Sequence, residues 1–358
     1  PAALMGVNVE HLLYRAERMR HSCDSCVPPE DNPGVMLGVA MGELAKQGRD
    51  KITFITSPVI GALGAWMEQL IAESTGKEGK GIVPIDDEPL GAPEVYGADR
   101  FFAYIRYAGG ADAAQDAKVA ALEKAGHPVV RIELTDLINL GEEFFLWEIA
   151  TAVAGSLLGI NAFDQPNVQE SKDYTKNFLD EYKKNGRLPE EEPVLTADGV
   201  KIYGDAATRE ALKGAATLEA VLKAHLARVK AGDYVALNAY VERTDASHQA
   251  LQGMRLRVRD RKTVATTLGY GPRFLHSTGQ LHKGGPNSGV FIQITSDDAQ
   301  DLPIPGEPYT FGVLKAAQAL GDFVCLGKRN RRAIRVHLGA DVETGLKKLQ
   351  AAMEKVLG

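Results

Sequence analysis

Short apolar runs alternate with longer amphipathic segments through the first half of the chain. The runs at 51–56, 81–85, 101–107 and 129–134 have the length and composition of buried strands. Between and around them, apolar spacing predicts helices at 8–22, 34–47, 59–75, 112–125, 142–158 and 167–184. Strands that alternate with helices in this way form a parallel sheet with helices on both faces. We therefore predict a three-layer α/β domain over residues 1–185.

The pattern restarts after a polar, charged and proline-containing stretch. That stretch has the composition of a linker, which we place at 186–195. Beyond it we predict strands at 234–241, 263–268, 290–295 and 333–338, and helices at 217–229, 247–260, 311–324 and 341–357. At 358 residues the chain is long enough for two domains of usual size. We therefore predict a second α/β unit over residues 196–358.

The net negative charge of the chain limits the kinds of molecule that it is expected to bind. The formal net charge is −6 and the isoelectric point is near 5.8, which argues against a nucleic-acid or polybasic membrane partner. No apolar run reaches the ~18 residues needed to cross a bilayer. We expect a cytoplasmic protein.

The cysteines do not indicate a metal or redox centre. Cys23 and Cys26 form a lone Cys-x-x-Cys in a polar stretch between two predicted helices, without the second pair of a zinc ribbon. A redox motif would follow a strand and open a helix, which this one does not. We interpret it as a loop in a reducing compartment and predict no metal and no cofactor.

Glu73 is the most informative acidic residue. It falls in the last turn of an otherwise apolar helix, where the negative end of the helix dipole disfavours an ionised carboxylate. Apolar neighbours act in the same direction, and a carboxyl in such a place can take up and return a proton near neutral pH. The alternative is an ordinary solvated glutamate at a helix end, which is the commoner case.

A second stretch, Gly-Ile-Asn-Ala-Phe-Asp-Gln-Pro, precedes the helix predicted at 167–184. Asn161 or Asp164 can cap this helix, and Pro166 is suited to its first turn. Lys172 would then lie on the second turn. By itself this is a well-capped helix start.

The third stretch, residues 269–289, is a long glycine-rich loop between two predicted strands. Such loops at strand ends of α/β domains often carry sites. Its histidines, His276 and His282, lack the third ligand that a zinc site needs. The Lys-Gly-Gly-Pro-Asn-Ser-Gly segment opens a strand, whereas a phosphate-binding loop opens a helix, so we do not predict a phosphate cradle there.

Together the three stretches resemble phosphoglucose isomerases. The shared features are Gln-x-x-x-Glu-Ser-x-Gly-Lys, then Gly-Ile-Asn-x-Phe-Asp-Gln-Pro followed by Lys, and a His-Ser-x-Gly-Gln loop. The His-Lys-Gly-Gly-Pro-Asn extension is similar to the isomerase half of fused transaldolase/glucose-6-phosphate isomerases. The resemblance covers residues 1–175 and about 230–340. It implies a flavodoxin-like sugar-isomerase domain and interconversion of glucose 6-phosphate and fructose 6-phosphate through a cis-enediol.

The resemblance also implies roles for individual residues. Glu73 matches the base that shuttles a proton between C1 and C2 of the open-chain sugar, and Gln69 lies one turn earlier on the same side of the helix, where it can bind a substrate hydroxyl. Lys172 matches a lysine that assists ring opening. His276 matches the ring-opening histidine, and Gln280 in the same loop is a candidate substrate-binding residue.

The chain departs from the family in two ways. The family's histidine lies between the glutamate and the lysine, whereas His276 follows Lys172, so the second half resembles a rearranged or partly duplicated piece of the isomerase fold. The family's Ser/Thr-rich phosphate loop and Gly-Gly-Arg motif are absent. We therefore interpret the chain as part of a longer polypeptide with an upstream isomerase domain and a transaldolase domain, and the resemblance implies a homodimer.

Two other functions fit parts of the pattern. Sugar-isomerase domains also serve as phosphosugar-binding modules without catalysis, which would not need the set Gln69, Glu73 and Lys172. A nicotinamide-dependent oxidoreductase is suggested only by the α/β alternation, and no Gly-x-Gly-x-x-Gly follows the first strand.

Overall fold

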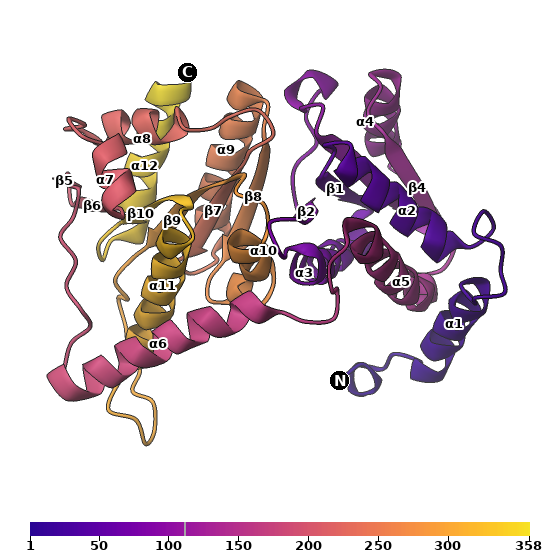
Figure 1. Ribbon diagram of the computed structural model, residues 1–358, viewed down its shortest axis with the longest axis horizontal. Helices are drawn as coiled ribbons and strands as arrows, with labels where there is room; N and C mark the ends of the chain where they lie inside the picture. The colour runs from indigo at the N-terminus through magenta and orange to yellow at the C-terminus, as the bar shows by residue number, and fades with distance from the viewer. Residues whose placement is uncertain (111) are drawn as a thin grey trace. The chain divides into compact units, whose positions relative to one another are not determined.

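The computed structural model describes residues 1–110 and 112–358, which form two compact units (Figure 1). The first unit consists of residues 1–94 and 98–164, and the second of residues 95–97 and 165–358. Each contains one sheet of mainly parallel strands and the helices that connect them. The predicted fold class, a parallel-sheet α/β domain followed by a second α/β unit, is confirmed.

The sheet of the first unit has four parallel strands in the order β2-β1-β3-β4. They are β1 (Lys51–Thr56), β2 (Val83–Ile85), β3 (Arg100–Tyr107) and β4 (Val129–Leu134). The central strands β1 and β3 are buried along almost their whole length, as parallel strands covered on both faces must be. From β1 the chain passes to β2 on one side, and from β3 it passes to β4 on the other.

Helix α5 is the centre of helix packing in the first unit and contacts α1, α2 and α3. The helices are α1 (Val9–Ser22), α2 (Pro33–Lys46), α3 (Ala62–Thr75), α4 (Ala113–Lys124) and α5 (Leu140–Leu158). Trp147 of α5 is fully buried and meets Phe54 of β1 edge-on, with ring centroids 5.8 Å apart. A Cβ atom on Gly38 of α2 would lie 2.5 Å from the carbonyl oxygen of Ala150, so glycine there permits the close contact of α2 with α5.

The sheet of the second unit has six strands in the order β5-β6-β10-β9-β7-β8. They are β5 (Leu195–Ala197), β6 (Val200–Tyr203), β7 (Tyr234–Tyr240), β8 (Ala265–Tyr270), β9 (Gly289–Thr295) and β10 (Arg332–His337). Strands β7 to β10 pair in parallel, and the hairpin of β5 and β6 adds to β10 in the antiparallel sense.

The helices of the second unit pack in two groups. They are α6 (Pro166–Asn185), α7 (Ala206–Ala211), α8 (Leu218–Leu226), α9 (Asp245–Lys262), α10 (Thr278–Gly284), α11 (Phe311–Lys328) and α12 (Val342–Leu357). Helix α12 packs against α8 and α9, whereas α6 packs against α10 and α11 (Figure 1). Short 3-10 helices lie at Ala3–Met5, Pro58–Ile60, Pro93–Val95, Ala108–Gly110, Leu137–Asn139 and Arg273–His276.

The parallel strands of the two units share one order. Strands β8-β7-β9-β10 repeat the sequence of β2-β1-β3-β4, with a helix between the first and second and between the third and fourth strands in chain order. The packing repeats as well, because α12 contacts α8 and α9 as α5 contacts α2 and α3. The second unit is therefore built on the same frame as the first, with a hairpin and the helix α10 added.

The division between the units lies earlier in the chain than the predicted linker. The first unit ends at Asp164, so α6 belongs to the second unit, where it packs along α11. The stretch 186–195 lies inside the second unit, and the backbone N–H of Val194 already donates to the carbonyl of Ile202 at 2.7 Å. The polar, proline-containing stretch is therefore a connection within the second unit, and the division between the units precedes α6.

The hairpin of β5 and β6 and the helices α7 and α10 have no counterpart among the elements that the sequence predicts. The hairpin of β5 and β6 turns at Asp198-Gly199, both with positive φ, which is the common residue pair of a two-residue hairpin turn. The loop predicted at 269–289 contains the 3-10 helix Arg273–His276 and the helix α10. In the part of the chain that the structure describes, no helix has the length and apolar character needed to cross a membrane.

Glu143, in the first turn of α5, is a buried carboxyl group. Its side chain accepts a hydrogen bond from Nε1 of Trp147 at 3.1 Å, and the residue is 4% exposed. Burial raises the pKa of Glu143 to about 7, against the smaller opposing effect of the Trp147 hydrogen bond. The folded protein therefore keeps a proton on Glu143 at a pH where the unfolded chain has lost it.

The free energy of unfolding is predicted to fall as the pH rises from about 4.5 to about 7. The loss attributable to Glu143 approaches about 3 kcal/mol, the equivalent of the difference in its pKa. Glu143→Gln should remove most of this slope and stabilise the protein at pH 8, as measured by urea unfolding at several pH values. Glu148→Gln, at an exposed position of the same helix, is the control and should leave the slope unchanged. Equal slopes in the wild type and Glu143→Gln would contradict the prediction.

Candidate functional site

Glu73 and Gln69 lie on the last two turns of α3. Glu73 is half-buried and Gln69 is exposed. Nε2 of Gln69 donates a long hydrogen bond of 3.4 Å to Oε2 of Glu73. Within the described residues, Glu73 makes no ion pair with a lysine, arginine or histidine. The carboxylate is thus oriented by an amide and is not neutralised, which suits a group that exchanges protons with a ligand.

Thr75 fixes the end of α3 that carries Glu73. Its hydroxyl donates to the carbonyl of Ile71 at 2.7 Å and accepts from the backbone N–H of Ile82 at 3.0 Å. This side chain joins the last turn of α3 to the approach to β2. Gly76 ends the helix with φ −74°, outside the left-handed region that glycine often adopts at a helix end.

Lys77 ties the same helix end to the segment that follows α5. Its ammonium group is almost fully buried and donates to the carbonyl of Asn161 at 2.7 Å and to the carbonyl of Asp164. It also pairs with Oδ1 of Asp164 at 3.0 Å. Lys77 therefore joins the motif that contains Glu73 to the motif that contains Asn161 and Asp164, within the first unit.

The predicted capping role of Asn161 and Asp164 is wrong. The residue before α6 is Gln165, whose side chain makes no cap, although Pro166 opens the helix as predicted. Asn161 instead accepts from the N–H of Phe163 and donates to Asp164, both at 3.0 Å, and this turn is what Lys77 holds. Sequence spacing placed these side chains next to the helix but did not reveal the buried lysine that binds both backbone carbonyls and the carboxylate of Asp164.

The second unit brings Lys172 and His276 to one cavity of about 400 Å³. Lys172 is exposed on α6, and His276 is the last residue of the 3-10 helix that follows β8. The other polar residues around the cavity are Ser171, Thr175, Lys176, Asp180, Lys183, Tyr309 and Gln318. Lys172 and His276 thus line the same cavity, although they are far apart in sequence and only the sequence motifs had suggested them.

The cavity has a cationic wall. Lys172 and Lys176 lie one turn apart on one face of α6. Lys183 lies two turns further along, and Asp180 lies between Lys176 and Lys183. Lys183 pairs with Glu307 at 3.0 Å, which raises the pKa of Lys183, and lies over the ring of Tyr309. Lys172 and Lys176 have no hydrogen-bond or ion-pair partner among the described residues, so two ammonium groups remain available to an anion. Their spacing in sequence could have identified Lys176 and Lys183.

Gln280 has a different place. Its carboxamide is fully buried in α10, accepts from the N–H of Asn167 at 2.9 Å and donates to Oδ1 of Asn167 at 2.8 Å. It therefore caps the first turn of α6 from a neighbouring helix, and it is not among the described residues that line the cavity of Lys172 and His276.

The candidate residues are divided between the two units. Gln69 and Glu73 belong to the first unit, and Lys172, His276 and Gln280 to the second. In the described parts of the chain, no cluster of three His, Cys, Asp or Glu residues is arranged to hold a metal.

Comparison with known proteins points to one enzyme class over half of the chain. No family model matches. The chain is 32% identical over 221 residues to a glucose-6-phosphate isomerase of Rubrobacter xylanophilus, which covers 49% of this chain and 49% of that protein. It is 25% identical over 232 residues to a glucose-6-phosphate isomerase of Parabacteroides distasonis, with coverage of 54% and 51%. The chain therefore spans about half the length of the curated relatives it matches.

The likeness to solved structures is weaker. A glucose-6-phosphate isomerase from Chlamydia trachomatis is 13% identical, with coverage of 97% of this chain and 72% of that chain and a TM-score of 0.31. The C-terminal domain of a glucosamine-fructose-6-phosphate aminotransferase from Francisella tularensis is 11% identical, with coverage of 97% and 96% and a TM-score of 0.25.

Removal of the Lys77 ammonium should destabilise the first unit. Lys77→Met leaves the carbonyls of Asn161 and Asp164 without their donor, so we expect the free energy of unfolding to fall by about 2–4 kcal/mol. Lys80→Met is the matched control, because Lys80 is exposed and donates to the carbonyl of Leu158 at 2.8 Å; its cost should be below about 1 kcal/mol. Denaturant unfolding of the two variants measures the difference. Equal losses of unfolding free energy would show that the contacts of Lys77 with Asn161 and Asp164 do not stabilise the first unit.

Proposed function

We propose that the polypeptide to which this chain belongs interconverts glucose 6-phosphate and fructose 6-phosphate. The observation that carries the proposal is Glu73, a half-buried, unpaired carboxylate held at a fixed helix end inside a motif that resembles phosphoglucose isomerases. The similarity of half the chain to glucose-6-phosphate isomerases supports the same reaction.

The proposed chemistry needs one base. Glu73 removes the proton from the carbon next to the carbonyl of the open-chain sugar, which gives a cis-enediol, and returns that proton to the neighbouring carbon on the same face. The hydroxyl proton moves between the two oxygens, so the substrate and product have the same atoms. Gln69 holds the carboxylate in place and binds a substrate hydroxyl.

Lys172 and His276 are proposed to open the sugar ring. Ring opening requires an acid for the ring oxygen and a base for the anomeric hydroxyl, and these two side chains line one cavity with groups of both kinds. Lys176, whose ammonium group has no partner among the described residues, adds positive charge that a phosphorylated sugar requires. Gln280 then contributes by fixing the start of the helix that carries Lys172.

The remaining parts of the proposal concern the longer protein. Because the chain spans about half of its relatives, we place the phosphate loop and the arginine that stabilises the enediolate in an upstream isomerase domain. The resemblance also suggests an upstream transaldolase domain, a homodimer and a cytoplasmic setting. A second candidate function is a phosphosugar-binding module without catalysis, which the unpaired Lys172 and Lys176 favour because they can bind an anion without Glu73.

Glu73→Gln should abolish isomerisation in the full-length polypeptide. The amide keeps the shape of the side chain but cannot take a proton, so kcat should fall by about a thousandfold or more in a coupled assay for glucose 6-phosphate formation. Glu78→Gln, an exposed position shortly after the motif, is the control and should keep full activity. An unchanged kcat in Glu73→Gln would refute the assignment, and an inactive wild type that still binds fructose 6-phosphate would establish the binding module instead.

Lys172→Met should separate ring opening from phosphate binding. If Lys172 assists ring opening, kcat falls by about a hundredfold with little change in KM. Lys184→Met removes a lysine from the end of the same helix, outside the cavity, and should retain wild-type kinetics. A rise in KM at constant kcat would assign Lys172 to phosphate binding, and unchanged kinetics would remove it from the site.

A further inference from the structure

A row of polar side chains crosses the sheet of the second unit at the carboxyl ends of its parallel strands. Strand pairing places Lys201 of β6 opposite His337 of β10, His337 beside Thr295 of β9, and Thr295 beside Tyr240 of β7. Residues in register on neighbouring strands point to the same face, so these four side chains form one line. With strands ~4.8 Å apart, the line is about 14 Å long.

The row lies where the direction of the chain changes. The chain leaves β7 toward β8 and leaves β9 toward β10, on the opposite side. In open α/β sheets, such switch points leave a crevice at the carboxyl ends of the strands, and ligands bind there. The crevice in this unit is a cleft of about 580 Å³, and all four residues of the row line it.

The hydroxyl of Tyr240 has no hydrogen-bond partner among the described residues, although the side chain is only 1% exposed. Its ring is held by Phe274, with centroids 5.3 Å apart, so it cannot readily turn away. Burial and the charge of Asp322 raise the pKa of Tyr240 well above its usual value, which keeps the hydroxyl protonated as a donor. A buried donor without an acceptor is costly unless a bound molecule supplies one.

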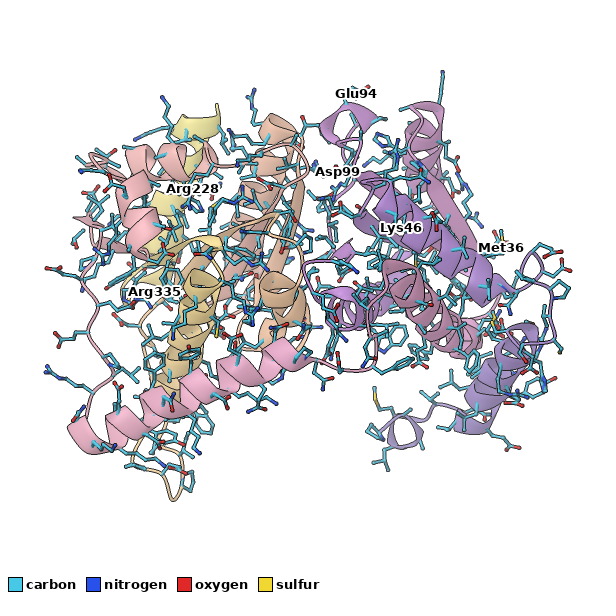
Figure 2. All side chains as sticks on the ribbon, viewed as in Figure 1. Met36, Lys46, Glu94, Asp99, Arg228 and Arg335 are labelled. Atoms are coloured by element: carbon cyan, nitrogen blue, oxygen red, sulfur yellow. The ribbon has the colours of Figure 1, made fainter. Side chains whose placement is uncertain are left out.

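The rest of the row offers hydrogen bonds and one free charge. Nδ1 of His337 lies 3.1 Å from the hydroxyl of Thr295, and its Nε2 lies 3.4 Å from Asp297. Lys201 is exposed at the end of the row and has no partner among the described residues. Arg335, labelled in Figure 2, lines the same cleft, where it pairs with Glu191 and lies over the ring of Tyr203, 4.2 Å from its centroid.

We infer that this cleft binds a small polyhydroxy compound with one anionic group, the anion at Lys201 and the hydroxyls along His337, Thr295 and Tyr240. Lys201 supplies a charge at one end of the row, and His337, Thr295 and Tyr240 supply donors and acceptors along it, which match a ligand of that chemistry, such as a sugar phosphate. The other charged residues of the cleft lie beside protein groups: Arg335 pairs with Glu191, Lys315 with Asp298 and Glu190 with Arg187, and Asp297 lies beside His337. The site is separate from the cavity of Lys172 and His276, whose lining residues are different, and it does not depend on the proposed isomerase activity.

The test uses 19F NMR of the full chain labelled with 3-fluorotyrosine. Tyr203 and Tyr240 report on this cleft, and Tyr309 reports on the cavity of Lys172 and His276, so the two sites are followed independently. The resonances are assigned by Tyr→Phe variants. Fructose 6-phosphate, fructose and inorganic phosphate are titrated as separate probes.

We expect fructose 6-phosphate to shift the Tyr203 and Tyr240 resonances saturably, with at least tenfold tighter binding than fructose or phosphate alone. Lys201→Met should weaken this binding by about ten- to a hundredfold, whereas Lys213→Met, at an exposed lysine outside the cleft, should not change it. Tyr240→Phe should weaken binding as well but leave the melting temperature unchanged or higher, because it removes an unpaired buried hydroxyl.

Any of the following results would overturn the inference. The Tyr203 and Tyr240 resonances could stay fixed with every probe, or the titration could be the same in Lys201→Met. Phosphate alone could bind as tightly as fructose 6-phosphate, which would reduce the site to an anion contact. A response of Tyr309 alone would support the proposed function while contradicting this second site.

Discussion

Parallel strand pairing sets the edge of the sheet at which Glu73 and the row from Lys201 to Tyr240 lie. In a parallel sheet every crossover helix runs back against the strands, so a helix that follows a strand ends at the amino edge of the sheet. Helix α3 connects the neighbouring parallel strands β1 and β2, which places Glu73 at the amino edge of the first sheet. The row from Lys201 to Tyr240 lies at the opposite, carboxyl edge of the second sheet. The positions of Glu73 and of the row from Lys201 to Tyr240 therefore both follow from the direction in which helices connect parallel strands.

The shared strand order of the two units shows what the Glu73 motif adds to that frame. In the first unit, residues 76–82 separate α3 from β2, and Thr75 and Lys77 fix this segment to its surroundings. In the second unit only residues 263–264 separate α9 from β8. In the first unit, the buried Lys77 thus fixes the long connection that follows α3. This connection keeps the end of α3, with the carboxylate of Glu73, at a defined place.

The sequence predicted the regular elements well because buried parallel strands are short apolar runs and the helices between them are amphipathic. It missed the hairpin at Asp198-Gly199, since a charged and proline-containing stretch immediately before it was interpreted as a linker. It also placed Asn161 and Asp164 as helix caps, because local spacing says nothing about Lys77, more than eighty residues away in sequence. Long-range partners of this kind, like the cap that Gln280 provides, follow from tertiary packing and leave no local signature.

We propose that one carboxylate, Glu73, moves a proton between neighbouring carbons of a sugar phosphate. The most direct measurement is the fate of the label when the full-length polypeptide converts glucose 6-phosphate deuterated at C2 to fructose 6-phosphate in ordinary water. If Glu73 is the base, part of the deuterium is found at C1 and part is lost to water, and Glu73→Gln does neither. Complete retention of the label in the product, or partial transfer that persists in Glu73→Gln, would contradict the proposal.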